Sequence, residues 1–418
     1  MLRMLYNLVE IQKGGRELSG QFYDVIVVGA GPAGSYAAYE LASYGYNVAV
    51  FEEKSAPGLN ACCTGIISAE CFRSLGLDAD VILTAINSAR FYSPSGKCLR
   101  LQTEKVQAYV VNRLLLDESL ASKAQSRGAL YFFSSPVIDV IPGRDGIQVE
   151  ALCSGVREIF SARAMVLANG FSPGLPRKLG LGKIKSFLVG AQAEVEAKNM
   201  DEPEIYFGQE IAPGAFAWLV PTSVGTSTNK AYVGLLATSQ GRLYLQKFLS
   251  NLFDHGRIAS QEVEIRQKAI PVGTLARSYG DRILVIGDAA GQVKPTTGGG
   301  IYFGHLGAKI AAGVLDEALS SDNLTAGQLS RYQKQWKTKM GKELSFGCMA
   351  RQAYIKLSDS QVEGIFSALD SSGMAEALLY SGDFSFDWHS RLLLAGLRRS
   401  SIYPLLKIKQ LVSREAGL

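Results

Sequence analysis

Two glycine-rich segments have the residue types and the spacing that bind phosphate groups. The first reads Gly29-Ala-Gly31-Pro32-Ala33-Gly34, a GxGxxG pattern that follows an apolar run. Its first glycine permits a tight turn, its second lets the backbone approach a pyrophosphate, and its third lets a helix pack on a strand. Glu52, 18 residues beyond Gly34, can accept hydrogen bonds from a ribose 2′-OH, and Glu53 follows it. We assign all of these residues to a dinucleotide site that disfavours a 2′-phosphate.

The second segment begins at Gly287-Asp288 and continues to Gly298-Gly299-Gly300, after which Ile301 starts a predicted helix. A carboxylate at the end of a buried strand can hold ribityl hydroxyls. Three glycines at a helix start let a flat ring and its phosphates approach the backbone. The two segments lie about 250 residues apart, and only one of them is a GxGxxG. We therefore expect a single large dinucleotide, FAD rather than NAD.

Two other segments contain residue types that stand out from their surroundings. Cys62 and Cys63 precede Gly65. The segment from Phe216 to Pro221 is apolar and contains Trp218. The three histidines lack the spacing of a metal site, so we expect no metal.

The elements that must position these residues alternate between strand and helix. Apolar runs at 24–28, 47–51, 164–168 and 282–286 are typical of buried parallel strands. Helices are predicted at 32–44, 112–124 and 243–253, and from Gly300 onward. Short strands are predicted at 88–92, 98–101, 137–141, 147–152 and 158–161, and much of 185–267 also has strand-and-turn character.

This order predicts an α/β fold in three parts. A Rossmann-like FAD-binding domain of the glutathione reductase type is expected at 20–84, 104–183 and 268–322. An inserted antiparallel β-sheet domain for substrate is expected at 85–103 and 184–267. A helical C-terminal region is expected at 323–418.

Composition limits the classes of function. The chain has 43 Lys+Arg and 38 Asp+Glu, a net charge of +5, which is too small to indicate nucleic-acid binding. Its six cysteines are sparse, so we expect a reducing cytoplasm and no disulfide framework. We find no apolar run of the ~20 residues that a membrane-spanning helix needs. Most of the excess charge lies in the basic segment 386–418, where a predicted helix from Pro404 could contact an anionic membrane surface.

The chain resembles the FAD-dependent geranylgeranyl reductase family, of the digeranylgeranylglycerophospholipid reductase type, within the fold of para-hydroxybenzoate hydroxylase-like flavoproteins. The glycine motifs are shared with many flavoproteins. Arg113, at the start of a helix, matches an arginine that contacts the cofactor in such proteins. The family's cysteine loop, often Cys-x-x-Gly, lies near the flavin and matches Cys62 to Gly65, although Cys63 could also be the residue that faces the flavin. The resemblance implies that a cysteine there positions substrate or supplies a proton.

The aromatic segment departs from the family pattern. The family motif is Tyr-x-Trp-x-Phe-Pro, whereas this chain keeps Trp218 and Pro221 but has Phe216 for the tyrosine and Val220 for the phenylalanine. A tyrosyl hydroxyl is therefore missing as a donor. An apolar wall of Phe216 and Trp218 suits a prenyl chain, because apolar burial contributes about 25 cal/mol per Å². Asn169 likewise stands where related flavoproteins usually have an aspartate.

The resemblance implies reduction of C=C bonds in a geranylgeranyl group by hydride transfer from reduced FAD. The substrate would be an isoprenoid lipid or a prenyl diphosphate. The chain shows no second GxGxxG that would form a stable nicotinamide site. The electron donor would therefore be NAD(P)H that binds transiently, or a ferredoxin-like protein. The alternative is a flavin-dependent monooxygenase or halogenase, whose Trp-x-Trp-x-Ile-Pro motif also resembles the segment at Trp218. The enzyme would be cytoplasmic, and its basic tail could hold it peripherally on the cytoplasmic membrane face.

Overall fold

The computed structural model describes residues 22–223, 230–371, 373–380 and 384–399. Its first sheet is mainly parallel, with β1 at the centre and the order β17-β18-β11-β1-β2-β8. The strands are β1 (Phe22–Val28), β2 (Val48–Phe51), β8 (Leu130–Phe132), β9 (Val137–Pro142), β10 (Ile147–Cys153), β11 (Val156–Leu167), β17 (Tyr279–Gly280) and β18 (Ile283–Val285). The first sheet thus joins segments that are far apart in the sequence.

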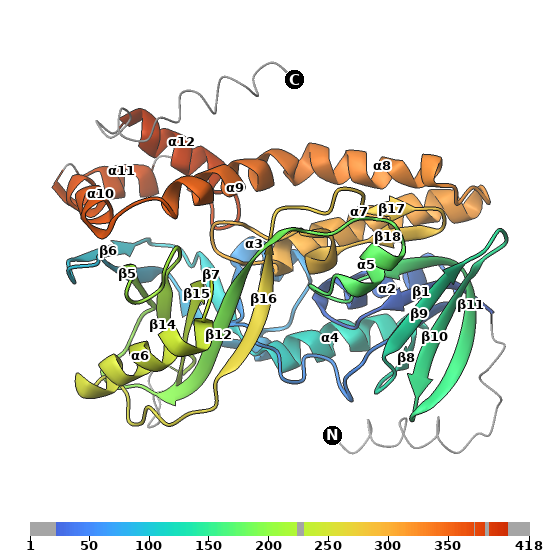
Figure 1. Ribbon diagram of the computed structural model, residues 1–418, viewed down its shortest axis with the longest axis horizontal. Coiled ribbons are helices and arrows are strands. Elements are labelled where there is room, and N and C mark those ends of the chain that lie inside the picture. The colour runs from blue at the N-terminus through green and yellow to red at the C-terminus, as the bar shows by residue number, and fades with distance from the viewer. Residues whose placement is uncertain (1–21, 224–229, 372, 381–383, 400–418) are drawn as a thin grey trace.

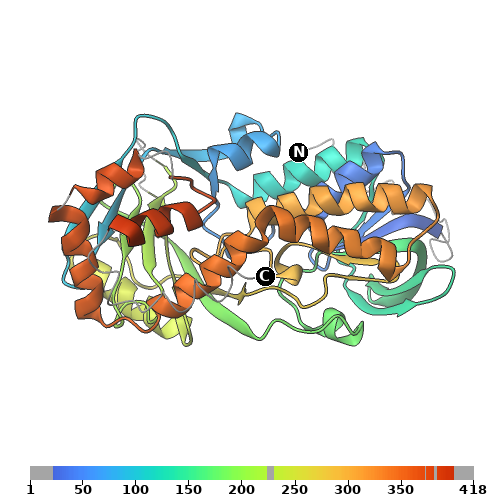
Figure 2. The same ribbon diagram turned by 90° about the horizontal axis from the view of Figure 1, so that it is seen from above.

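Both faces of this sheet are covered (Figures 1 and 2). Helices α2 (Pro32–Ser43), α4 (Arg113–Ser126) and α7 (Ile301–Ser320) lie beside one another on one face. Val25 and Val27 of β1 pack against these helices, whereas Ile26 and Val28 pack against β9, β10 and β11. Because successive side chains in a strand point to opposite faces, an unbroken apolar run is what a strand covered on both sides requires.

Two predicted strands, 158–161 and 164–168, form the single strand β11. Residues 156–162 of β11 pair antiparallel with β10, and residues 161–167 pair parallel with β1. Strand β18 pairs with β11 at Met165–Leu167, beyond the end of β10. No turn residue interrupts the chain between Ser161 and Ala164, so the strand continues while its partners change.

The second sheet is largely antiparallel and has the order β16-β12-β15-β14-β13-β5-β6. Its strands are β5 (Ser88–Tyr92), β6 (Cys98–Gln102), β12 (Ser186–Glu196), β13 (Glu204–Tyr206), β14 (Ala217–Pro221), β15 (Lys230–Ala237) and β16 (Arg266–Val272). Helix α6 (Gly241–Asp254) packs on one face of it. Strand β16 extends this sheet to Val272, beyond residue 267, where the inserted domain was predicted to end. The domain boundaries as a whole stay a prediction.

The remaining elements connect and cover the two sheets. A third sheet contains β3 (Ile66–Ser68), β7 (Ala108–Val111) and β4 (Ile82–Ile86). Short helices are α3 (Ala69–Ser74), α5 (Gly174–Lys178), η1 (Ala79–Val81) and η2 (Gly287–Ala290). The C-terminal helices are α8 (Ala326–Trp336), the π-helical turn η3 (Lys337–Gly341), α9 (Lys342–Tyr354), α10 (Asp359–Ser371), α11 (Met374–Leu379) and α12 (Ser390–Arg399).

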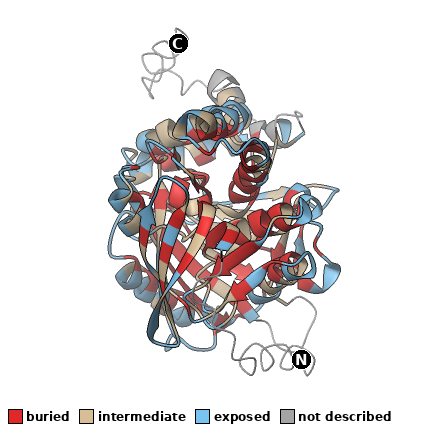
Figure 3. Ribbon diagram, turned by 90° about the vertical axis from the view of Figure 1, so that its right-hand side faces the viewer, coloured by how far each residue is buried: buried red, intermediate tan, exposed pale blue. Residues whose placement is uncertain are grey.

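The predicted α/β class, with an antiparallel sheet and a helical C-terminal region, is confirmed. Figure 3 shows that buried residues gather in the strands and on the inner sides of the helices. No helix in the described part of the chain is long and apolar enough to cross a membrane. The predicted basic helix from Pro404 lies outside the described residues, so peripheral membrane contact stays a prediction.

Candidate active site

Three glycines of the first motif have different physical roles. Gly29 has φ +103°, and a Cβ there would lie 2.5 Å from the carbonyl oxygen of Ala168. A Cβ on Gly34 would overlap the carbonyl oxygen of Gly29. Gly31, by contrast, has φ −72° and nothing within 4 Å of where a Cβ would be. The fold itself thus requires Gly29 and Gly34, whereas Gly31 leaves open space at the N-terminus of α2, where a phosphate could approach.

Glu52 lies at the end of β2, beside this glycine loop. Its carboxylate accepts hydrogen bonds from the backbone N–H of Ala30 at 2.8 Å and of Lys54 at 3.0 Å. These bonds fix the acid next to Gly31, where a ribose would lie if a dinucleotide followed the loop. Glu53 is exposed, so of the two predicted acids only Glu52 is directed at the loop.

The second motif meets the first in space. A Cβ on Gly287 would lie 3.1 Å from the Cβ of Ala33, in the first turn of α2, and one on Gly304 would lie 3.3 Å from it. A Cβ on Gly300 would be 2.6 Å from Oδ1 of Asp288, so this carboxylate lies against the start of α7. Gly298 adopts φ +74°, and Gly299 packs on Lys294. Segments about 250 residues apart therefore lie together in the fold, and their assignment to one cofactor site stays a prediction.

Arg113 is the first residue of α4, whose N-terminus is capped by the side chain of Asn112. Its guanidinium donates to both carboxylate oxygens of Asp117, at 2.9 and 3.0 Å, and both side chains are largely buried. Burial opposes the charge on Arg113, but Asp117 and Cys63 together outweigh it and keep the arginine pKa above its usual range. The Nε of Arg113 is buried and has no partner among the described residues. Buried donors usually have partners, so this atom is a candidate contact for a ligand.

The cysteine loop separates its two thiols. The Cys62 thiol donates to the carbonyl oxygen of Arg266 on β16 at 3.6 Å, and its burial, followed by the nearby Cys63, raises its pKa to about 11. The Cys63 sulfur interacts with Arg113 and accepts the N–H of Gly65 at 3.4 Å. Thr64 donates to Gln192 on β12 at 2.8 Å. The loop thus bridges Arg113 at the start of α4 and the second sheet.

One face of the second sheet, which we call the inner face, is directed at the second glycine motif. Residues directly opposite in an antiparallel sheet share a face. One row across the sheet is Trp218, Gly234, Gln192 and Arg266. The next row is Phe216, Leu236, Gly190 and Lys268. Leu236 and Ile270 meet Gly298, because a Cβ on that glycine would lie 3.1 and 3.5 Å from their Cδ1 atoms.

The aromatic residues of β14 line this inner face. A Cβ on Gly234 would overlap the Trp218 ring, so the indole lies over the glycine. Phe216 packs beside Trp218, with ring centroids 5.9 Å apart, and the indole Nε1 is buried without a partner among the described residues. Pro221 is one residue beyond Val220 and therefore belongs to the opposite face of the strand, outside this wall.

Several site residues were missed by the sequence analysis. Lys268 donates to Oδ2 of Asp288 at 2.7 Å, and Asp117 is the partner of Arg113. Gly234 had a usable signal, because a glycine inside a strand often marks a close approach of another group. Lys268 and Asp117 had none, because only the folded chain brings them to their partners.

The C-terminal region also reaches the second motif. Lys294 donates to Oδ1 of Asp387 at 2.9 Å, in a pair that is almost fully buried. Oγ1 of Thr296 and Nδ1 of His389 are 2.7 Å apart. Phe386 packs in a cluster with Trp218 and Val220. The segment before α12 is therefore anchored to the loop that precedes Gly298.

His305 is buried in α7, where its ring packs edge-on against Tyr36 at 4.2 Å. Burial lowers its pKa from 6.5 to about 4.

The buried His305 makes the stability of the protein depend on pH. Below pH 6.5 the unfolded chain binds a proton that the folded chain does not, so stability falls as the pH drops toward 4. We expect His305 to reduce the free energy of unfolding by about 2.5 kcal/mol between pH 7.5 and 4.5. Denaturant titrations of the wild type and His305→Leu should show a smaller pH-dependent loss in the variant; equal losses would contradict this assignment.

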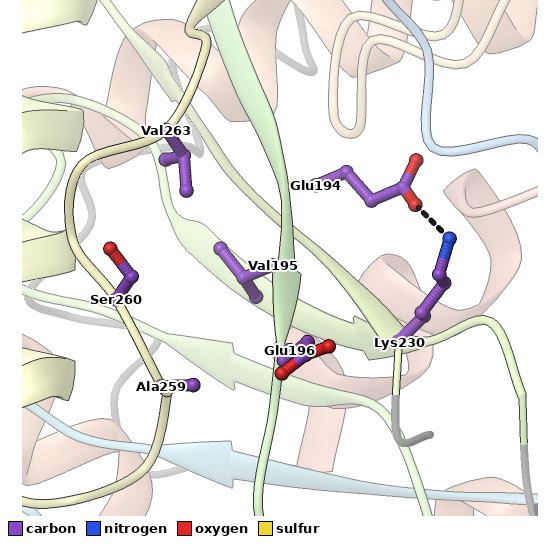
Figure 4. A pocket seen from close by; sticks show the side chains of 7 residues that line it. All are labelled: Glu194, Val195, Glu196, Lys230, Ala259, Ser260 and Val263. Carbon is purple, nitrogen blue, oxygen red and sulfur yellow. Dashed lines mark ion pairs between the residues drawn. The ribbon is translucent and has the colours of Figure 1, made fainter.

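A hollow of about 300 Å³ lies elsewhere on the second sheet (Figure 4). It is lined by Glu194, Val195, Glu196, Lys230, Ala259, Ser260 and Val263. Lys230 and Glu194 form an ion pair at 3.2 Å, and Glu196 and Ser260 are also polar. Because it contains none of the motif residues or cysteines, we do not assign it to the active site. Among the described residues, no cluster of three or more His, Cys, Asp or Glu is arranged to hold a metal ion.

The residues of the two motifs fit a flavin dinucleotide. Gly31 leaves an open approach to a helix N-terminus, and the Glu52 and Asp288 carboxylates lie at the ends of parallel strands. The Nε of Arg113 and the Oδ1 of Asn169 are buried polar atoms without partners among the described residues. Buried polar atoms usually have partners, so orphaned ones in a cradle indicate a missing ligand.

Comparisons with known proteins show to which family the chain belongs. The sequence model of the lycopene cyclase protein family matches residues 24–368. A digeranylgeranylglycerophospholipid reductase from Methanocaldococcus jannaschii is 31% identical, over 85% of this chain and 93% of that protein. A crystal structure of a geranylgeranyl bacteriochlorophyll reductase-like protein from Thermoplasma acidophilum is 23% identical, with a TM-score of 0.82, and covers 94% of this chain and 99% of that one.

A more distant likeness concerns the alternative function. The flavin-dependent brominase Bmp2 is 18% identical, with a TM-score of 0.67, over 89% of this chain and 97% of that one. At this identity the likeness shows the fold, which is that of flavin-dependent enzymes. By the match of the family model and the identity to its relatives, the chain belongs to the digeranylgeranylglycerophospholipid reductase-like family, within the group that the lycopene cyclase protein model describes.

Proposed function

We propose that the protein is an FAD-dependent oxidoreductase that reduces C=C bonds of a geranylgeranyl group carried by a lipid or a diphosphate. The observation that carries the proposal is the contact between the inner face of the second sheet and the second glycine motif. Phe216 and Trp218 lie on the same face as Leu236 and Ile270, which meet Gly298. A prenyl chain on this apolar wall would lie beside the cofactor loop.

The residues have distinct roles in this proposal. The α2 N-terminus with Gly31 would hold the pyrophosphate, Glu52 the ribose, and Asp288 the ribityl chain, while Arg113 would direct its free Nε at the cofactor. Reduced FAD would supply the hydride for one alkene carbon. The inner face would orient the prenyl chain and exclude water from it.

The test begins with the purified full-length protein, which should carry yellow FAD. Under anaerobic conditions, the reduced flavin should be oxidised when a geranylgeranyl lipid or geranylgeranyl diphosphate is added. The product mass should rise by two hydrogens for each bond reduced. A flavin that stays reduced would count heavily against the proposal. Product formation that strictly requires O₂ would instead support a monooxygenase or halogenase, and an isomeric product of unchanged mass would support a cyclase.

The electron donor is tested in the same preparation. NADH, NADPH and a reduced ferredoxin are compared for the rate at which each reduces the bound flavin. The three candidates belong to two classes, nicotinamide nucleotides and ferredoxin-like proteins, and we propose that one of these classes is the donor. The fastest donor at equal concentration identifies the class.

We expect Cys62, rather than Cys63, to supply the proton for the second alkene carbon. The pKa of its thiol is about 11, so the thiol is protonated at neutral pH. It also faces the second sheet, whereas Cys63 faces Arg113. Cys62→Ala should slow substrate-dependent oxidation of the reduced flavin about 100-fold, a typical contribution of a general acid. The matched variant Cys63→Ala should slow it less than about threefold.

The pH dependence gives an independent check on this assignment. A donor with a pKa of about 11 stays protonated at lower pH, so its contribution should be constant from pH 6 to 9 and fall only as the pH approaches 11. Stopped-flow rates at several pH values measure this. A larger effect of Cys63→Ala, or a rate that already falls near pH 8, would contradict the assignment to Cys62.

A further inference from the structure

Lys268 links the two halves of the site. It stands on β16, in the same row of the inner face as Phe216, and its Nζ is 2.7 Å from Oδ2 of Asp288 in the second glycine motif. The residue opposite Lys268 on β12 is Gly190, and the side chains of Ile270 and Leu236 pack over this glycine. The fold therefore places an ammonium group of the second sheet directly against the carboxylate proposed to hold the ribityl chain.

The charges around Lys268 form two balanced pairs. Arg113 is neutralised by Asp117 through two hydrogen bonds, and Lys268 neutralises Asp288. Asp288 is the largest cause of the raised pKa of Lys268, so the lysine keeps its charge. The side chain of Lys268 is 44% exposed, and Asp288 is its one acceptor among the described residues. An ammonium has three donors, so two remain available for a ligand.

We propose that Lys268 is a positioning residue of the flavin site, which holds Asp288 in place and makes the site bind the reduced cofactor more tightly than the oxidised one. The proposal rests on the proposed FAD site. A flavin that has gained two electrons carries negative charge at neutral pH, and a nearby fixed positive charge is one means by which a protein tunes a cofactor. Without Lys268, the charge of Asp288 would instead repel the reduced form.

The experiment measures the flavin rather than its reaction with substrate. FAD affinity of the apoprotein and the midpoint potential of the bound flavin are determined for the wild type and Lys268→Met. We expect the ratio of reduced to oxidised affinity to fall at least tenfold in the variant. For a two-electron couple, this corresponds to a midpoint potential about 30 mV lower. Thermal unfolding of both proteins without FAD shows whether the fold is kept.

Three further variants separate charge from structure. Lys268→Arg keeps the positive charge and should retain most of the wild-type potential. The double variant Lys268→Met/Asp288→Asn removes both charges and should recover most of the shift. Arg266→Met is the matched control, because Arg266 lies two residues away on the same face but pairs with Glu264. Its potential should equal that of the wild type.

An unchanged potential in Lys268→Met overturns the inference, whether or not the variant is less stable, because a purely structural ion pair would alter stability alone. A shift of equal size in Arg266→Met overturns it as well, since the effect would then not be specific to the pair with Asp288. If the potential shifts as expected but prenyl lipids do not oxidise the flavin, the proposed function fails and this inference stands. A wild type that binds no flavin defeats both.

Discussion

Gly34→Ala should destabilise the whole protein, whereas Gly31→Ala should fold normally and lose its cofactor. A Cβ on Gly34 would overlap the carbonyl oxygen of Gly29 and lie 3.1 Å from the Cβ of Ala168. The overlap is with backbone, so it can be relieved only by moving α2 away from β1. Overpacking commonly costs about 1–3 kcal/mol, and a backbone overlap should cost at least ~3 kcal/mol. Denaturant unfolding without added FAD measures this loss.

The Gly31 variant isolates the ligand from the fold. Its backbone has an ordinary φ of −72°, and nothing lies within 4 Å of the new methyl group. Stability without FAD should therefore stay within about 0.5 kcal/mol of the wild type. The methyl group would occupy the approach of the pyrophosphate, and FAD affinity should fall at least tenfold, about 1.4 kcal/mol. Equal FAD binding by Gly31→Ala and the wild type would show that the phosphates do not use this loop.

Arg113→Met should be nearly as damaging, because it leaves a buried charge without a partner. The Asp117 side chain is 3% exposed, and Arg113 supplies both hydrogen bonds that it accepts within the described part of the chain. Burial already raises the pKa of Asp117 while Arg113 lowers it, so loss of the arginine raises this pKa further. Breaking one side of a buried pair typically costs about 3–5 kcal/mol. We expect a loss of this size in the free energy of unfolding at pH 7.

A double variant separates the structural role of Arg113 from its proposed role in binding. Replacing both charges, as in Arg113→Met/Asp117→Leu, removes the unpaired carboxylate and should restore most of the stability. It cannot restore the free Nε donor, so FAD affinity should stay at least tenfold below the wild type. If the double variant bound FAD as well as the wild type does, Arg113 would be a structural residue alone.

Much of the fold follows from local sequence. The apolar run 25–28 has residues for both faces of a covered strand, and the glycines after it meet constraints set within the same turn. Helices α2, α4 and α6 lie within two or three residues of the predicted bounds for the same reason, because helical periodicity is a local property. The break predicted within β11 was wrong, because a change of partner strand leaves no mark in the sequence.

The sequence alone determined the glycine cradles, the acid at the end of β2 and the aromatic segment of β14, since each is a contiguous pattern whose geometry arises within a few residues. Only the tertiary structure decided which groups face one another: Lys268 and Asp288 across two sheets, and Trp218 over Gly234. It also separated Cys62 from Cys63 by giving them different neighbours. Strand register and the packing of distant segments set these contacts, and neither is specified by the spacing of residues along the chain.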